Sequence, residues 1–208
     1  MPGGEFDHEG KGGPPAMDRL RQAEIIEGGG RGALIAGLAG WGWILWGLFA
    51  GQAFTPTYGI VLLCVEILLL CGAVLCMVKG RKLRRQVPSL PVSVRRNTRN
   101  WFLLVLAAEI GAIMIVVVIA RSLHRIDLAI VWIAMIVGIH FLPLARIFRA
   151  RALGVIGVLI TIWCLVSWGL FRSSAVAISA AIGTGILLWV ASAQALIRAY
   201  QAARSLRQ

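Results

Sequence analysis

Charged residues are scarce in this chain. Lys, Arg, Asp and Glu make up 14% of its 208 residues, whereas soluble domains carry about a quarter. Hydrophobic residues make up 59%, and the mean hydropathy is +0.82. A fold in water cannot remove this much apolar surface from solvent. The composition therefore excludes an ordinary soluble domain and predicts a membrane protein.

Acidic residues are rarer still. Nine acidic residues stand against 21 basic ones, which gives a formal net charge of +12. Nucleic-acid-binding domains have a similar excess, but they gather it in a patch on a soluble domain. Here the basic residues lie between long apolar runs. We therefore predict no nucleic-acid partner and expect anionic lipid, at the cytoplasmic face of the bilayer, to be the acidic partner.

Cysteine patterns and enzyme signatures are missing as well. All four cysteines lie inside apolar runs without CxxC or Cys/His spacing, so we predict packing residues and neither a disulfide framework nor a metal site. No GxSxG, HExxH, Walker or CxxCH motif occurs. Such motifs position nucleophiles, metals and phosphates. The sequence predicts a protein that is not an enzyme and that holds no cofactor or metal.

Long apolar runs dominate the rest of the chain. They are 33–53, 58–78, 101–120, 128–145, 152–171 and 173–197. A helix needs about 20 residues to cross the hydrocarbon, whereas a barrel strand needs about 10 of alternating polarity. The runs predict an all-α integral membrane protein with six transmembrane helices in a domain at 33–198.

The flanking segments have a different composition. Residues 1–32 are predicted to be a disordered and juxtamembrane cytoplasmic segment, because the first 15 are rich in Gly, Pro and acids. Within it, 17–27 has the pattern of a short amphipathic helix, which Gly28-Gly29-Gly30 is expected to break. Residues 199–208 are predicted to be a cytoplasmic tail.

The distribution of positive charge predicts the orientation. With the N-terminus inside, 18 of the 21 basic residues fall in cytoplasmic segments and only Arg121, Arg125 and Arg172 fall outside. This asymmetry in short loops predicts an N-in/C-in topology. The 18 arginines against three lysines are typical of a GC-rich bacterial genome, so we expect a multi-pass protein of a bacterial cytoplasmic (inner) membrane.

Connection lengths predict how the helices pair. The three outer turns are very short, which favours three antiparallel hairpins joined on the inside. A repeat supports this interpretation, since Trp41-x4-Trp46-Gly-Leu-Phe reappears as Trp163-x4-Trp168-Gly-Leu-Phe. Descent from a repeated hairpin is one explanation. The preference of aromatic residues for the membrane interface is the other.

Two further patterns concern packing and lipid. Small residues recur at four-residue spacing in the first and last runs, which favours close helix contacts within the chain, in a homo-oligomer or in a larger membrane complex. They are Gly37 and Gly40, which follow Ala33 and Ala36 by four residues each, and Ala177, Ala181 and Gly185. The inner loop 79–99 carries eight basic residues and no acid. Topology alone explains it, but contact with anionic lipid is a further role for Arg81, Lys82, Arg84, Arg85, Arg95, Arg96 and Arg99.

Three polar residues lie deep in the apolar runs. They are Glu66, Glu109 and His140. An ionisable side chain in the hydrocarbon core costs free energy, so each should be buried against protein and paired. Helical rise places Glu109 and His140 in one layer near the midplane, which predicts a direct or water-mediated bond between them. Glu66 should also face protein. A structural hydrogen bond is one interpretation of these residues, and a proton or cation site is the other.

The overall plan resembles the HdeD-like family of small six-helix bacterial inner-membrane proteins. The similarity rests on the basic and aromatic opening of the third run, on mid-helix glycines and on basic helix ends. These are Arg95-Arg96, Arg99-Asn100-Trp101, Gly138, Gly183 or Gly185, Arg146 and Arg198. The resemblance implies a role in acid-stress tolerance and supplies no catalytic residues. We therefore predict a non-enzymatic stress-related or accessory/structural subunit. The alternative is a small transporter or proton pathway through Glu66, Glu109 and His140.

Overall fold

A computed structural model of the chain describes residues 16–85, 92–148, 150–171 and 174–205. Within these ranges, only the backbone is described for residues 16–21, 92–99, 126–127 and 174. In these ranges the regular secondary structure is entirely α-helical. The helices are α1 (Ala16–Ala50), α2 (Pro56–Arg84), α3 (Val92–Ser122), α4 (Ile126–Ile147), α5 (Arg151–Leu170) and α6 (Ser174–Ser205).

The described helices are long and apolar enough to span a membrane. Each holds at least 20 residues in its candidate span, and together they make six such spans. A span of about 20 residues covers the hydrocarbon core at 1.5 Å per residue. The protein is thus an all-α membrane protein with six spanning helices, as the apolar runs predict.

The start of α1 corrects the prediction for residues 16–32. The helix begins at Ala16 and runs through Gly28-Gly29-Gly30 without a break. Glycine lowers helix propensity by about 1 kcal/mol, but here it permits close packing. A Cβ atom at Gly29 would lie 3.1 Å from the Ala195 carbonyl oxygen of α6, and one at Gly30 would lie 2.8 Å from the Ala73 carbonyl oxygen of α2. Helix contacts therefore outweigh propensity. Residues 1–15, predicted to be disordered, lie outside the described residues.

Other helices also extend beyond their predicted bounds. The third begins at Val92 instead of 101, and the last continues to Ser205 through most of the predicted tail. The backbone hydrogen bonds of a helix do not depend on the polarity of its side chains. A spanning helix can therefore extend through polar residues into the headgroup layer. Hydrophobicity therefore marks the membrane-crossing part of a helix and not its ends.

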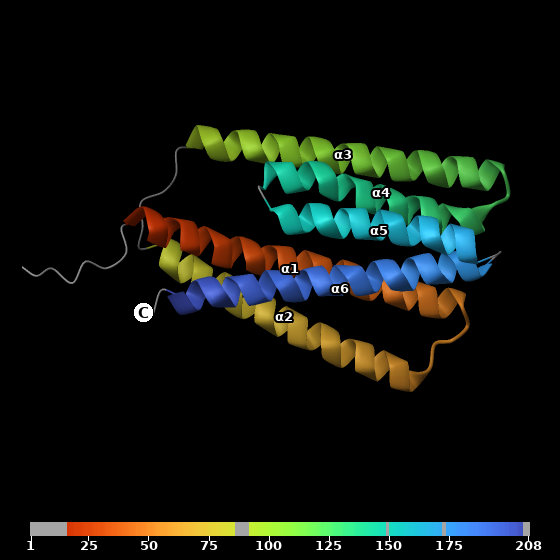
Figure 1. The fold of residues 1–208 in the computed structure, drawn as a ribbon, viewed down its shortest axis with the longest axis horizontal. Coiled ribbons are helices and arrows are strands. Elements are labelled where there is room, and N and C mark those ends of the chain that lie inside the picture. The colour runs from red at the N-terminus through yellow and green to blue at the C-terminus, as the bar shows by residue number, and fades with distance from the viewer. Residues whose placement is uncertain (1–15, 86–91, 149, 172–173, 206–208) are drawn as a thin grey trace, which may run out of the picture.

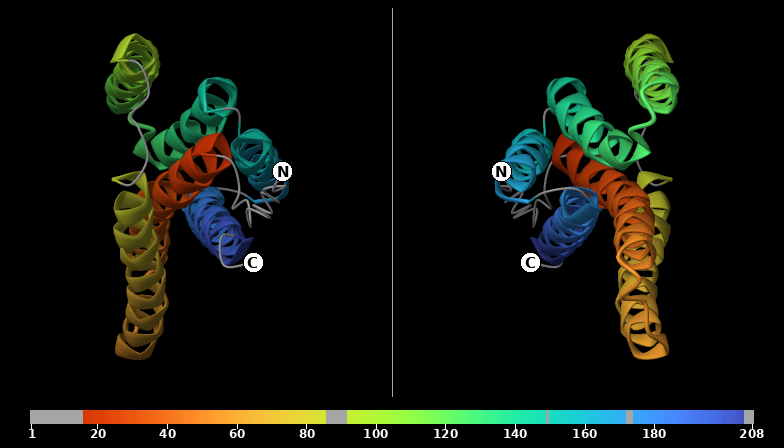
Figure 2. Two further views of the ribbon diagram at one scale, coloured as in Figure 1. Left: turned by 90° about the vertical axis from the view of Figure 1, so that its left-hand side faces the viewer. Right: turned by 90° about the vertical axis from the view of Figure 1, so that its right-hand side faces the viewer.

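The bundle is organised around three long seams between helices (Figure 1). The most extensive joins α1 to α6, the next joins α1 to α2, and the third joins α4 to α5. Sequence neighbours α1/α2 and α3/α4 also pack together, but α5 packs more on α4 than on α6. All three predicted hairpin pairs are thus in contact, but the α1–α6 and α4–α5 seams are more extensive than some of them and were not part of the hairpin prediction. In the end-on views of Figure 2, α2 and α3 stand at opposite extremes of an open bundle.

The alternation of helices places their termini at two ends. The starts of α1, α3 and α5 and the ends of α2, α4 and α6 lie at one end, and their other termini lie at the opposite end (Figure 1). The first end carries most of the basic residues. The N-in/C-in assignment of this end to the cytoplasm stays a prediction.

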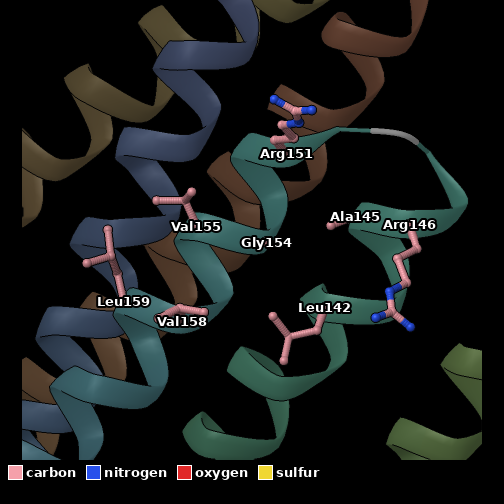
Figure 3. A pocket seen from close by; sticks show the side chains of 8 residues that line it. All are labelled: Leu142, Ala145, Arg146, Arg151, Gly154, Val155, Val158 and Leu159. Atoms are coloured by element: carbon pink, nitrogen blue, oxygen red, sulfur yellow. The ribbon is translucent and has the colours of Figure 1, made fainter.

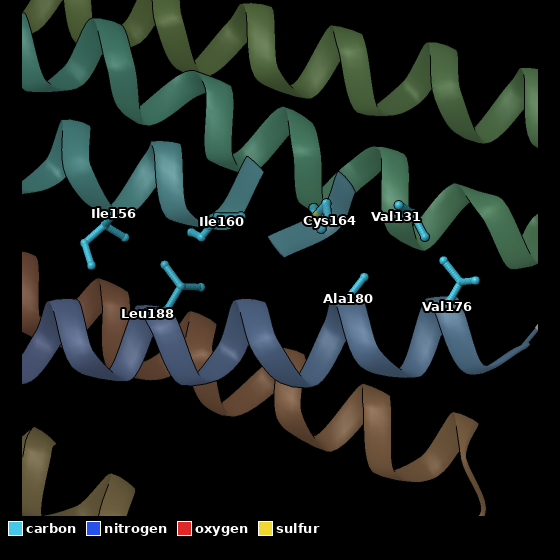
Figure 4. Packing of buried hydrophobic residues seen from close by; sticks show 8 residues of the cluster. Val131, Ile156, Ile160, Cys164, Val176, Ala180 and Leu188 are labelled. Carbon is cyan, nitrogen blue, oxygen red and sulfur yellow. The ribbon is translucent and has the colours of Figure 1, made fainter. Parts of the chain in front are cut away.

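An apolar core joins α4, α5 and α6 (Figure 4). Its fully buried members include Val131, Ile160, Cys164, Ala180 and Leu188. Cys164 thus has the predicted packing role, whereas Cys64 and Cys71 are exposed on α2. These two cysteines therefore do not pack against another described helix, and the prediction that they are packing residues is wrong for them within one copy of the chain.

Candidate functional site

The predicted small residues lie at contacts between helices of this chain. A Cβ atom at Gly40 would lie 2.8 Å from the Gly185 carbonyl oxygen, and one at Gly185 would lie 2.6 Å from the Gly40 carbonyl oxygen. Ala177 and Ala181 are buried beside Ile130 of α4. Such close backbone approach supplies the van der Waals contact that holds helices together in lipid. The α1–α6 seam therefore uses these residues within one copy of the protein.

Glu66 lies where α1, α2 and α6 meet. It is only 3% exposed, and Gly37 provides the space for it, because a Cβ atom at position 37 would lie 3.1 Å from Glu66 Oε1. The Trp189 indole N–H donates to Glu66 Oε2 at 3.2 Å and to the Gly37 carbonyl oxygen at 3.3 Å. Ser192 Oγ donates to the Ala33 carbonyl oxygen at 2.8 Å one turn away. Glu66 therefore faces protein, as predicted.

One oxygen of this carboxyl group remains without a partner. Glu66 Oε1 is buried and makes no hydrogen bond with any residue that the structure describes. Burying an unpaired polar atom costs about 1–3 kcal/mol. Trp189 of α6 thus links Glu66 of α2 to the backbone of α1. Glu66 Oε1, which could bind a proton, makes no hydrogen bond with a described residue.

Glu109 and His140 form a pair between α3 and α4. His140 Nδ1 lies 3.2 Å from Glu109 Oε1 and 2.8 Å from the Val137 carbonyl oxygen. A carbonyl oxygen only accepts, so this contact assigns a proton to Nδ1, which is then shared with Glu109. Both side chains are mostly buried, at 11% and 17% exposure. The direct contact agrees with the depth estimate from the sequence.

The two polar groups are separate. In the part of the chain that the structure describes, α3 packs only on α4, and α2 packs only on α1 and α6. Glu66 therefore has no packed helix in common with Glu109. The three residues do not form a continuous polar path through one copy of the protein.

The basic end contains an ion-pair cluster that the sequence interpretation missed. Glu27 of α1 has a side chain only 7% exposed and pairs with Arg31 and with Arg84, at 3.2 Å for the latter. Arg81 Nε lies 4.0 Å from the same carboxylate. Gly80 permits the approach, since a Cβ atom there would lie 2.6 Å from the Glu27 backbone nitrogen. The spacing of Glu27 and Arg31 by four residues was the available signal.

This cluster changes the account of the basic loop. Arg81 and Arg84 join α1 to α2 through Glu27, so they are not simply lipid contacts. Lys82 and Arg85 are exposed, and their contact with anionic lipid stays a prediction. The side chains of Arg95, Arg96 and Arg99 lie outside the described residues.

Two further hydrogen-bonded pairs of side chains could not be predicted from the sequence. The Trp189 indole N–H needs an acceptor in the membrane, and the Glu66 carboxyl group needs a donor, but the sequence does not show that α6 and α2 face each other. Ser167 and Ser179 share a hydrogen bond of 3.0 Å. Ser192 Oγ lies near the Glu66 carboxyl group, since a Cβ atom at Gly37 would lie 3.6 Å from the hydroxyl and 3.1 Å from Glu66 Oε1.

The comparisons with known proteins concern the second half of the fold. Residues 92–198 match the model of a family of unknown function (DUF7010). The match spans α3, α4, α5 and most of α6. It covers just over half of the 208 residues. The chain belongs to this family. No match was found among curated proteins or among solved structures.

The DUF7010 region contains the Glu109–His140 pair and Trp189, whereas Glu27 and Glu66 precede it. The family description states no activity. The similarity to HdeD-like proteins and the role in acid stress therefore stay predictions.

Proposed function

We propose that this DUF7010 protein is a non-enzymatic accessory or structural subunit of an assembly in a bacterial inner membrane. The observation that carries the proposal is the isolation of α3. In its most apolar stretch of 18 residues none is fully buried, whereas half of the corresponding stretch of α6 is. The α2 stretch is only 11% buried. Two of six helices thus have wide apolar surfaces without a protein partner in the described chain.

Lipid alone is a poor explanation for the position of α3. The helix is attached to the bundle along one seam, with α4, and that seam holds the Glu109–His140 pair. Polar pairs of this kind are costly in a membrane and are kept where they fix one helix against another. A fixed α3 that projects from the bundle is suited to presenting a surface to another protein.

The polar residues support a structural role for the same reason. Glu66 binds Trp189 at a junction of three helices, and Glu109 binds His140 at the attachment of α3. Each contact joins helices that are distant in sequence or weakly packed. A stress-related role is the part of the proposal that rests on the resemblance to HdeD-like proteins.

A proton pathway is the second candidate. Its support is the 3.2 Å contact between two ionisable groups, Glu109 and His140, and the unpaired oxygen of Glu66. The separation of Glu66 from the Glu109–His140 pair favours the accessory role. A proton path through one copy of the protein would need all three residues to lie close to one another.

Photo-crosslinking tests the accessory role. A photoreactive amino acid is placed at Leu104 or Ile115 on α3, at Leu68 on α2, and at Ile162 on α5 as the control, all of them exposed positions. We expect protein adducts from α3 and α2 in intact membranes and few from Ile162. An adduct of twice the chain mass identifies a second copy, and any other mass identifies a different subunit. Absence of protein adducts at both Leu104 and Ile115 would contradict the proposal.

A further inference from the structure

An open groove lies between α4 and α5 beside their connection. Its volume is about 480 Å³, and its walls include Leu142 of α4 and Gly154, Val158 and Leu159 of α5 (Figure 3). The helices approach closely at its floor, where a Cβ atom at Gly154 would lie 3.3 Å from the Ala145 Cβ. The surface is almost entirely apolar and follows the direction of the helices, which is the direction of a lipid acyl chain.

Two arginines lie at the end of the groove nearest the connection. Arg146 belongs to the last turn of α4, and Arg151 is the first residue of α5 (Figure 3). Both are exposed, and neither forms an ion pair with any residue that the structure describes. This distinguishes them from Arg81 and Arg84, which bind Glu27. Their charge is therefore available to an anion.

The start of α5 adds donors at the same place. Its N-cap residue is Ala150, which offers no side-chain acceptor, and no side chain caps the first turn. The first amide N–H groups of a helix lack intrahelical partners and favour an anionic group such as phosphate. The first turn of α5 and two exposed arginines thus lie at the same end of an apolar groove, with Arg151 extending beyond the start of α5 and Arg146 extending along α4 (Figure 3).

We propose that this groove binds one anionic phospholipid. The headgroup phosphate contacts Arg146, Arg151 and the first turn of α5, and one acyl chain lies along Leu142, Val158 and Leu159. From Arg151 to Leu159 the helix rises about 12 Å, which matches the upper part of an acyl chain. A neutral phospholipid lacks the net charge that the arginines neutralise, and a free phosphate lacks the chain. This lipid site goes beyond the accessory role, because it needs no protein partner.

Native mass spectrometry of the full chain in detergent tests the proposal. Dioleoyl phosphatidylglycerol and dioleoyl phosphatidylcholine are titrated separately. A basic residue near an anionic headgroup contributes roughly fivefold in affinity, so Arg146→Ala with Arg151→Ala should weaken phosphatidylglycerol binding about 25-fold. The control is Arg198→Ala with Arg204→Ala, which removes two exposed charges from the same end of the bundle. This control should change the affinity less than threefold.

A second variant tests the apolar part of the groove. Gly154→Leu should fill it and weaken binding of phosphatidylglycerol, whereas Gly169→Leu, at an open position of α5 with nothing nearby, should not. Equal phosphatidylglycerol affinity in the wild type and the Arg146/Arg151 double variant would overturn the proposal. So would equal affinity for phosphatidylcholine, or displacement of the lipid by millimolar inorganic phosphate, which would indicate a surface anion site.

Discussion

Replacing Gly185 with leucine is expected to destabilise the protein by about 3 kcal/mol, because the new side chain must enter a seam with no room for it. A Cβ atom alone at this position would lie 2.5 Å from Ile44 Cγ1 and 2.6 Å from the Gly40 carbonyl oxygen. The α1–α6 backbones would have to separate along the most extensive contact of the fold. Thermal unfolding in detergent, followed by circular dichroism, should show a Tm lower by roughly 10 °C.

The matched control for this experiment is Gly42→Leu. Gly42 lies on the same helix as Gly40, but it is exposed and nothing lies within 4 Å of a Cβ placed there. Its replacement should leave the Tm unchanged or raise it slightly, since leucine has a higher helix propensity than glycine. Similar Tm values for the Gly185 and Gly42 variants would show that the seam does not hold α1 against α6.

Removing His140 is expected to loosen α3. His140→Ala leaves the Glu109 carboxyl group without its ring partner at the only seam that α3 makes in the described chain. An unpaired carboxyl group in the membrane is costly, and polar contacts between membrane helices contribute about 1–2 kcal/mol. We expect this loss in a detergent unfolding titration, together with faster proteolysis of the α3–α4 connection.

Two further variants separate pairing from other effects. Glu109→Leu combined with His140→Phe replaces both partners with apolar groups and should recover most of the stability, because no buried polar group is left unmatched. His124→Asn, at an exposed position in the α3–α4 connection with a φ of 52° that asparagine also adopts, is the control and should have no effect. Additive losses in the double variant would contradict a direct interaction between Glu109 and His140.

A further variant of Glu109 distinguishes the structural role from the proton pathway. Proton flux is measured in liposomes that contain the wild type or the Glu109→Gln variant. The accessory role predicts the flux of empty liposomes for both proteins. Flux in the wild type that Glu109→Gln abolishes would support the pathway and contradict a purely structural pair.

The membrane fold could be predicted from sequence because it depends on the length of apolar runs. A run of about 20 apolar residues has few alternatives to a spanning helix. The contact between Glu109 and His140 could be predicted because helical rise fixes depth in the membrane. Both inferences depend only on distance along a helix, and this distance follows from the number of residues in the sequence.

Relations between helices were predicted less well for a physical reason. Lipid chains are as apolar as leucine, so a helix surface that faces lipid and one that faces protein have similar residues. The pairing of α6 with α1 was therefore not visible, nor was the meeting of Trp189 with Glu66. The sequence also predicts a helix break at Gly28-Gly29-Gly30, because the close contacts of Gly29 with α6 and of Gly30 with α2 exist only in the folded bundle.

The mass of the particle in its native bilayer tests the accessory role most directly. The protein is extracted from its membrane in polymer-bounded discs without detergent, and the protein mass of each disc is measured. One chain has a mass of 22.5 kDa. The exposed surfaces of α2 and α3 predict discs that hold further protein, either additional copies or a second subunit, in a fixed ratio. Discs that contain a single 22.5 kDa chain and lipid would contradict the proposal.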